Sequence, residues 1–167
     1  MKVRPWLLSV VGALAVVALW QIGVSAQSGG LDTSAGKTVF DSSCVACHQS
    51  TGQGVPSTFP PLVGTVPEFF KKGDAGRTVL QDIVLFGTAG EITVNGQTFN
   101  GQMPTWGKIL SDQQITDVLN YVSTAWGNDK LLPKDWKPFT TDEIKAEHGK
   151  ADLTPPQTHE ARQKLGL

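Results

Sequence analysis

The sequence predicts a fold of the all-α class that carries one small β-hairpin. Apolar residues recur at helical spacing in two segments, residues 79–84 and residues 115–122. Between them, Asn95 and Gly96 separate two short runs in which apolar and polar residues alternate, which is the strongest local signal for a hairpin. With 167 residues, 40% of them hydrophobic, the chain is long enough for one compact domain.

A short amphipathic helix is expected to lead into the first cysteine. Residues 32–34 are all favourable N-cap types, and Val39 and Phe40 follow at spacings compatible with one apolar face. The predicted helix leads directly into Cys44. Residues 49–64 are rich in glycine and proline, so they are expected to form an ordered loop.

Two longer helices are predicted from their apolar spacing and their end signals. The helix expected over residues 74–86 stops before Gly87, a residue suited to a left-handed C-terminal turn. Ser111 and Gln114 form a capping box at the start of the next helix, whose apolar positions repeat at helical intervals. This second helix is expected to end at Gly127.

Beyond Asn128 the composition changes to proline, lysine, aspartate and threonine. One helix is expected over residues 141–148, under a capping box of Thr140 and Glu143. The segment has too few apolar residues for a second core. We therefore interpret residues 27–128 as the domain and residues 129–167 as an extended C-terminal tail, laid against the domain or partly disordered.

The N-terminus has the pattern of an export signal. Lys2 and Arg4 precede an apolar run that begins at Trp6, and small residues precede a predicted cleavage point after Ala26. Residues 1–26 are therefore interpreted as a signal peptide. The alternative is an uncleaved membrane anchor, because the apolar run approaches the roughly 20 residues of a spanning helix. Either way, the body is expected in the periplasm or at the outer face of the cytoplasmic membrane.

The charge of the chain argues against two classes of partner. The formal net charge is -1, and the predicted signal contains Lys2 and Arg4 but no acidic residue, so the remaining body is mildly acidic. Such a surface does not favour nucleic acid or anionic lipid. We expect no nucleic-acid partner, and membrane attachment only through the N-terminal segment.

The central motif is Cys44-Val45-Ala46-Cys47-His48. Two thiols at this spacing can bond the two vinyl groups of a haem, and the adjacent histidine is then presented to the iron. A thioredoxin-type dithiol would need a strand-helix-strand context, and a zinc site would need further paired cysteines or histidines. Neither context is present, so the motif predicts one covalently attached haem c, with His48 as an iron ligand.

Met103 is the candidate for the second iron ligand. It is the only methionine outside the predicted signal, and Gly101 and Pro104 lie on either side of it in a predicted loop. A methionine opposite a histidine raises the reduction potential of a haem. The alternatives are a core methionine, or ligation by His148 or His159, which lie in the polar tail and are expected to be solvated.

The surroundings of the haem are predicted from the same segments. The second ring nitrogen of His48 needs an acceptor, for which the carbonyl of Pro60 or Pro61 is a candidate; the alternative is that these are simple turn prolines. Arg77 is a candidate partner for a haem propionate, or otherwise a surface arginine. Four side chains are expected to wall the macrocycle unless they are ordinary core residues: Phe59, Leu62, Ile83 and Trp106.

Taken together, these motifs resemble the class I monohaem cytochromes c. The matching segments, in chain order, are residues 44–48, 59–64, 95–104 and 110–128. The resemblance covers about residues 32–128 and implies a cytochrome c fold with crossing N- and C-terminal helices. It also implies His48 as proximal ligand, Met103 as distal ligand and a prolyl carbonyl bonded to His48. The long tail departs from the family's short C-terminus.

The resemblance predicts a one-electron carrier in a bacterial respiratory or periplasmic electron-transport chain, without catalytic residues. The expected partners are redox proteins, a donor and an acceptor such as a terminal oxidase, a nitrite reductase or a quinoprotein dehydrogenase. One alternative is a haem subunit of a larger oxidoreductase. Another is a haem enzyme or gas sensor with a labile sixth ligand, which Met103 argues against.

Overall fold

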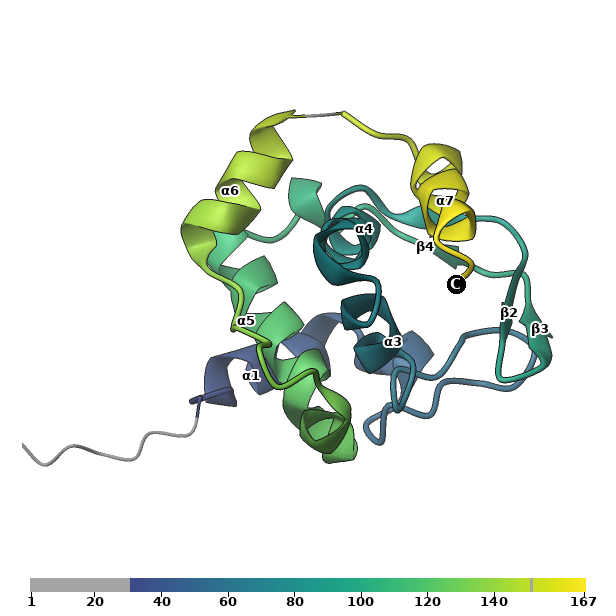
Figure 1. Cartoon of the computed structure of the whole chain (residues 1–167), viewed down its shortest axis with the longest axis horizontal. Helices are drawn as coiled ribbons and strands as arrows, with labels where there is room; N and C mark the ends of the chain where they lie inside the picture. The colour runs from purple at the N-terminus through teal and green to yellow at the C-terminus, as the bar shows by residue number, and fades with distance from the viewer. Residues whose placement is uncertain (1–30, 151) are drawn as a thin grey trace, which may run out of the picture. The chain divides into compact units, whose positions relative to one another are not determined.

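The computed structural model describes residues 31–150 and 152–167, and within them the fold is mainly helical (Figure 1). The helices are α1 (Ser34–Ser43), α2 (Val45–His48), α3 (Val66–Phe70), α4 (Gly73–Phe86), α5 (Asp112–Thr124), α6 (Thr141–Lys150) and α7 (Pro155–Lys164). Among the described residues, no helix combines the length and the apolar character that a membrane span requires. The predicted signal peptide and its cleavage point lie outside these residues.

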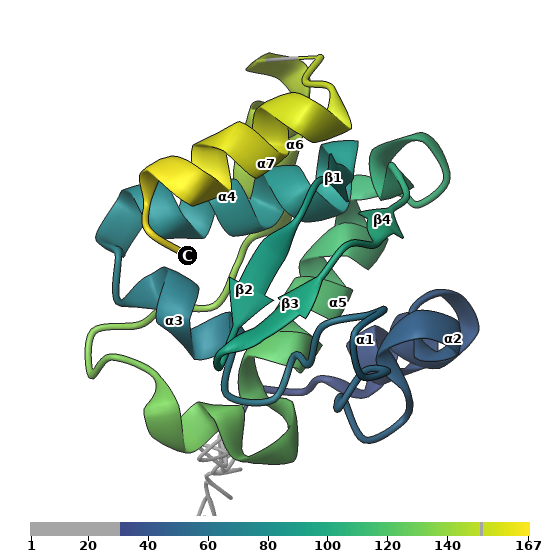
Figure 2. The ribbon, with the colours of Figure 1, turned by 90° about the vertical axis from the view of Figure 1, so that its right-hand side faces the viewer.

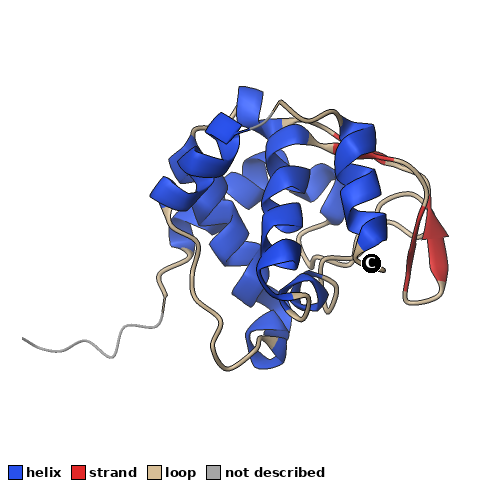
Figure 3. Ribbon diagram, turned by 45° about the horizontal axis from the view of Figure 1, so that its top comes forward, coloured by secondary structure: helices blue, strands red, loops and turns tan. Residues whose placement is uncertain are grey.

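The strands are short and lie at one edge of the helical body (Figure 3). They are β1 (Thr88–Ala89), β2 (Ile92–Val94), β3 (Gln97–Phe99) and β4 (Gln102–Met103). The pairs β2-β3 and β1-β4 are both antiparallel. The predicted hairpin is confirmed, because Asn95 and Gly96 join β2 to β3 with φ of 52° and 77°, the left-handed conformation that such a turn requires.

The core lies where α1 packs across α5, with α3 and α4 beside them. Gly36 allows the close approach of α1, since its Cα faces the backbone of α5. Phe40 is fully buried, and its ring meets those of Tyr121 and Trp126 at centroid distances of 5.4 and 5.1 Å. Other buried core residues are Val39, Val66, Phe69, Leu80, Leu85, Ile115 and Leu119.

The start of α5 follows the prediction, but its end does not. The Ser111 hydroxyl accepts a hydrogen bond from the Gln114 backbone amide, and the Ser111 backbone amide donates to the Gln114 side-chain oxygen, so the capping box is confirmed. The helix ends at Thr124, before the expected Gly127. Trp126 adopts a φ of 56°, which turns its ring back onto Phe40. Two 3₁₀ segments complete the domain, η1 (Trp106–Lys108) and η2 (Ala125–Leu131).

The C-terminal extension is ordered and forms part of the same compact unit, residues 31–167. The expected helix over residues 141–148 is found as α6, which packs on α4 and α5 through the fully buried Ile144. Helix α7 was not predicted, although Thr154 and Gln157 form a capping box at its start. It lies along α4 and beside β1 (Figure 2). The alternative of a partly disordered tail is therefore wrong for its described residues.

Arg77 anchors this extension to α4. Its guanidinium donates two hydrogen bonds to the Glu143 carboxylate, at 2.6 and 2.8 Å, and one to each of the Lys137 and Pro138 carbonyls. The guanidinium also lies 3.9 Å from the centre of the Phe139 ring. The hypothesis that Arg77 pairs with a haem propionate is therefore wrong, because all of these contacts hold it at the α6 side of α4.

Candidate haem site

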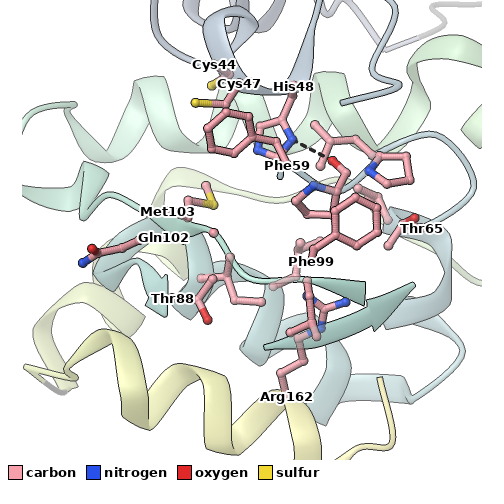
Figure 4. Close-up of a pocket in the computed structure, with 18 of the residues that line it drawn as sticks. Cys44, Cys47, His48, Phe59, Thr65, Thr88, Phe99, Gln102, Met103 and Arg162 are labelled. Atoms are coloured by element: carbon pink, nitrogen blue, oxygen red, sulfur yellow. Dashed lines mark hydrogen bonds between the residues drawn. The ribbon is translucent and has the colours of Figure 1, made fainter. Parts of the chain in front are cut away.

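A large, mostly apolar pocket opens between the α2 turn, strand β4 and helix α7 (Figure 4). Its empty volume is about 990 Å³, which includes the part of its mouth that is open to solvent. All of the following predicted site residues line this pocket: Cys44, Cys47, His48, Pro61, Leu62, Met103 and Trp106. The fold therefore gathers side chains from distant parts of the chain around one space.

The two cysteines lie at the junction of α1 and α2, where a single helical turn carries both to the pocket. The amides of Cys47 and His48 donate to the Cys44 carbonyl, at 3.2 and 3.0 Å, which closes this turn. Both cysteines are free thiols. Burial raises the pKa of the Cys44 thiol to about 11, and the nearby Cys47 adds to the rise. An uncharged sulfur suits this position, and a thioether bond to a haem vinyl group also leaves the sulfur uncharged.

His48 is oriented by the loop that follows it. Its Nδ1 lies 3.1 Å from the Pro60 carbonyl oxygen, which can only accept, so Nδ1 carries the hydrogen. This selects Pro60 rather than Pro61 from the two predicted acceptors. Burial lowers the pKa of His48, although the bond to Pro60 opposes the change. The ring is therefore held neutral with Nε2 available, which is the form that binds iron.

The Pro60 carbonyl is itself held by a compact loop. The Gly54 amide donates to the His48 carbonyl at 3.0 Å, and the Leu62 amide donates to the Gly52 carbonyl at 2.7 Å. Gly54 has a φ of +68°, and a Cβ there would lie 2.7 Å from the Pro60 oxygen. Only glycine allows this approach; the glycine-rich composition predicted the loop but not this role of Gly54.

Met103 is held more firmly than a loop residue would be. It lies in β4, where it pairs with Thr88 of β1 in an antiparallel register. The Thr105 hydroxyl, two residues later, donates to the Phe86 carbonyl at 3.0 Å. Figure 4 shows the side chains of His48 and Met103 directed into the pocket from different elements, α2 and β4. The predicted loop is in fact a short paired strand.

The pocket is lined by all four apolar side chains that were predicted to wall the macrocycle, Phe59, Leu62, Ile83 and Trp106. The structure adds Val66, Phe69, Leu80 and Phe99. Of these, Leu80 lies at helical spacing with Ile83, so the periodicity contained a signal for it. The other three have no local signal, because α3 and β3 meet the pocket only in the folded chain.

Three residues that line the pocket carry a buried polar atom without a hydrogen-bond partner in the described part of the chain: Thr65 Oγ1, Thr88 Oγ1 and Arg162 Nε. None of the three was a predicted site residue. Apolar walls combined with unpaired polar atoms suit an amphiphilic ligand. Haem is such a ligand, since its macrocycle is apolar and its propionates are charged. The lining therefore fits the cofactor that the cysteine motif predicts.

The two histidines of the tail do not line this pocket, which argues against them as iron ligands. They are also not simply solvated, as the sequence suggested. His148 Nδ1 lies 2.8 Å from an Asp112 carboxylate oxygen, which ties α6 to the start of α5. The ring of His159 packs against Gly90, and its Nδ1 is buried.

Comparison with known sequences decides the family. The sequence model of the cytochrome c family matches residues 33–126, a stretch that includes the cysteine motif and Met103. The chain belongs to the cytochrome c family. The predicted family and the predicted all-α fold are both confirmed.

Its relatives include single-domain and multi-domain proteins. A cytochrome c-552 of Thermus thermophilus is 45% identical over 124 residues, which cover 74% of this chain and 92% of the relative. The gluconate 2-dehydrogenase cytochrome c subunit of Pantoea cypripedii is 33% identical over 141 residues, 81% of this chain and 29% of the subunit. A quinone alcohol dehydrogenase cytochrome c subunit of Gluconobacter oxydans is 35% identical over 96 residues, 58% of this chain and 19% of that subunit.

Family membership establishes the cofactor and the type of activity. The cytochrome carries haem c, covalently bound and containing iron, and it transfers electrons rather than acting as an enzyme. The predicted cofactor is thus confirmed. The roles of the individual site residues stay predictions.

Proposed function

We propose that this cytochrome is a one-electron carrier in which His48 and Met103 bind the haem iron from its two axial sides. The observation that supports this most directly is that both side chains enter the pocket of the cysteine pair. Each is held by a backbone contact of its own, His48 by Pro60 and Met103 by pairing with Thr88. With two axial ligands, the iron has no open position for a substrate.

The other pocket residues have distinct roles in this proposal. Cys44 and Cys47 bond the haem covalently to the chain, so that the haem stays bound while electrons are transferred. The bound haem c supplies a one-electron couple between ferric and ferrous iron. Pro61, Leu62 and Trp106 exclude water on the pocket walls. An apolar, poorly hydrated surrounding disfavours the extra charge of the ferric state, so these residues raise the reduction potential.

Spectra of the purified protein with and without carbon monoxide test the ligand assignment. The wild-type protein is expected to show a low-spin haem with the far-red sulfur-to-iron band, and its ferrous form is expected not to bind carbon monoxide. Met103→Ala is expected to lose the band and to bind carbon monoxide fully, because removing the thioether opens one axial position.

The matched control is Ile109→Ala, a change at an exposed apolar residue six positions along the chain, with 67% of its surface accessible. Its spectra should equal those of the wild type. Carbon monoxide binding by the unmodified ferrous protein would overturn the assignment of Met103.

We also propose that the chain works outside the cytoplasm, in a bacterial respiratory or periplasmic redox chain. The export pattern of residues 1–26 supports this proposal. Mass spectrometry of the haem-loaded protein from producing cells is expected to find residue 27 as the first residue. A mass that includes residue 1 would contradict cleavage and favour the anchor.

The partners in this proposal are a donor and an acceptor redox protein. Two relatives are named as cytochrome c subunits, of a gluconate 2-dehydrogenase and of a quinone alcohol dehydrogenase, and a third as a subunit of a cbb3-type cytochrome c oxidase. A separate carrier is the primary proposal and a haem subunit of a larger oxidoreductase is the alternative, because relatives of both kinds match the chain. Co-purification in a stable stoichiometric complex would instead support the subunit.

A further inference from the structure

Arg162 of α7 is a buried cation without an anionic partner in the described part of the chain. Arg162 is 5% exposed, and its Nε has no hydrogen-bond partner among the described residues. The guanidinium lies 5.5 Å from the centre of the Phe69 ring, a contact that does not satisfy its N–H groups. Burial lowers the pKa of Arg162 to about 10, and no neighbouring acid opposes this. Burying a charge without a partner is strongly unfavourable, so the site favours an anion.

The contrast with Arg77 shows how the chain satisfies a guanidinium that is only half-buried. Arg77 has a bidentate carboxylate partner and two backbone carbonyls. Arg162 lacks both kinds of partner although it is the more deeply buried of the two. Guanidinium groups bind carboxylates in this bidentate way, so the missing partner has the chemistry of a carboxylate.

Arg162 lines the haem pocket on the side away from the cysteines. Figure 4 shows Cys44 and Cys47 at one end of the pocket and Arg162 at the other. The vinyl groups and the propionates of a haem lie on opposite edges of its macrocycle. Bonding through the two cysteines therefore directs the propionate edge toward the end that holds Arg162.

Two hydroxyl groups at the same pocket also lack partners among the described residues. Thr65 Oγ1 and Thr88 Oγ1 are buried and unpaired, and both residues line the pocket with Arg162. They come from the start of α3 and from β1, so three separate segments each bring an unsatisfied polar group to this pocket. Hydroxyl groups can donate to carboxylate oxygens as the guanidinium does.

The extension holds α7 in position independently of any ligand. The Thr158 hydroxyl donates to the carbonyl of Gly87, next to β1. A Cβ on Gly90 would lie 2.5 Å from the His159 ring, so only glycine allows the ring to pack there. Arg162 is thus placed at the pocket by contacts that fix the rest of its helix.

We propose that Arg162 binds a haem propionate, with the hydroxyl groups of Thr65 and Thr88 as further donors. The C-terminal extension then completes the haem site, where it supplies the cation that keeps a buried propionate ionised. This inference depends on the covalent haem and not on the identity of the sixth ligand. A negative result of the carbon monoxide experiment would therefore overturn the assignment of Met103 without affecting this inference. A negative result of the experiment below would overturn this inference without affecting the assignment of Met103.

Among the described residues, no other ionisable group around α7 takes this role. Besides Arg162, the ionisable residues of α7, α3 and α4 and of the α3–α4 junction are Glu68, Lys71, Lys72, Asp74, Arg77, Asp82, His159, Glu160 and Lys164. None of these lines the pocket. Glu68 pairs with Lys71 and Glu160 with Lys164, both at exposed sites. Asp82 lies toward Glu147 and Lys150 of α6, as their influence on its pKa shows.

The test is the midpoint potential of the haem as a function of pH, from about pH 5 to 8. In the wild type, Arg162 holds the pKa of the propionate below this range, so the potential is expected to be independent of pH. In Arg162→Met, the propionate is expected to take up a proton within the range. A propionate anion favours ferric iron, so the potential should then fall as pH rises, by up to about 59 mV per pH unit, a tenfold change in the one-electron equilibrium.

Arg162→Lys keeps the positive charge and is expected to restore most of the flat profile. Arg77→Met is the matched control, because it removes a guanidinium outside the pocket and should leave the profile flat. A profile of Arg162→Met that superimposes on the wild type would overturn the proposal. If Arg162→Met is not recovered with haem, the double variant Thr65→Val/Thr88→Val is expected to show a smaller slope of the same sign, and a flat profile would overturn the proposal.

Discussion

Gly36→Ala is expected to destabilise the protein by about 3 kcal/mol. A Cβ on Gly36 would lie 2.0 Å from the Asp117 carbonyl oxygen and 2.7 Å from the Tyr121 Cβ, both on α5. The nearest of these atoms belongs to a helix backbone and cannot rotate away, so α1 would have to move off α5. Since Cys44 follows α1 directly, the same shift would displace the haem attachment site.

Urea unfolding of the haem-loaded protein measures this effect, and Gly149→Ala is its matched control. Gly149 lies in α6 with no heavy atom within 4 Å of the position of a Cβ. Alanine is the better helix former by about 1 kcal/mol, so the control should be neutral or slightly stabilising. Equal stability of Gly36→Ala and the wild type would show that the two helices do not need this close contact.

Asn128→Ala is expected to cost about 3 kcal/mol of stability, at roughly 1 kcal/mol for each hydrogen bond lost. Asn128 is fully buried. Its side-chain oxygen accepts from the Gly64 amide at 2.8 Å, and its side-chain nitrogen donates to the carbonyls of Leu62 and Val122, at 3.2 and 2.8 Å. Alanine leaves the Gly64 amide without this acceptor, and the carbonyls of Leu62 and Val122 each lose a donor.

The same change should loosen the pocket, because Leu62 is one of its walls. The free energy of unfolding in urea and the intensity of the far-red sulfur-to-iron band are the two measurements. Asn100→Ala serves as control, since Asn100 is exposed, and it should change stability by less than about 0.5 kcal/mol. If Asn128→Ala unfolds like the control, the link between the loop and α5 is not a source of stability.

The helices that could be predicted are those with strong local signals. The prediction of residues 74–86 corresponds to α4 at Gly73–Phe86, and the capping box at Ser111 marks the start of α5. By contrast, α3 has only five residues, and α7 has a largely polar sequence. A short or polar helix is marginal by itself and persists through its tertiary contacts. For α7 these contacts are with α4 and β1, which no local pattern indicates.

The iron and thioether chemistry could be predicted because it depends on residues that are adjacent in the chain. Two thiols and an imidazole within five residues suffice to indicate covalent haem, and Met103 was the only methionine available outside the signal. The acceptor of the His48 hydrogen could be narrowed only to Pro60 or Pro61, since the choice depends on how the loop folds around Gly54.

The surroundings of Arg77 and Arg162 could be assigned only from the folded chain. Arg77 lies in the domain and was interpreted either as a propionate partner or as a surface arginine, yet it pairs with Glu143, 66 positions later. Arg162 lies in a polar tail with no sequence feature to separate it from a solvated arginine, yet it is buried at the haem pocket. Helical spacing and motifs report neighbours within a few residues. Which distant groups share a low-dielectric interior, and which charges are left without a partner there, is determined by packing.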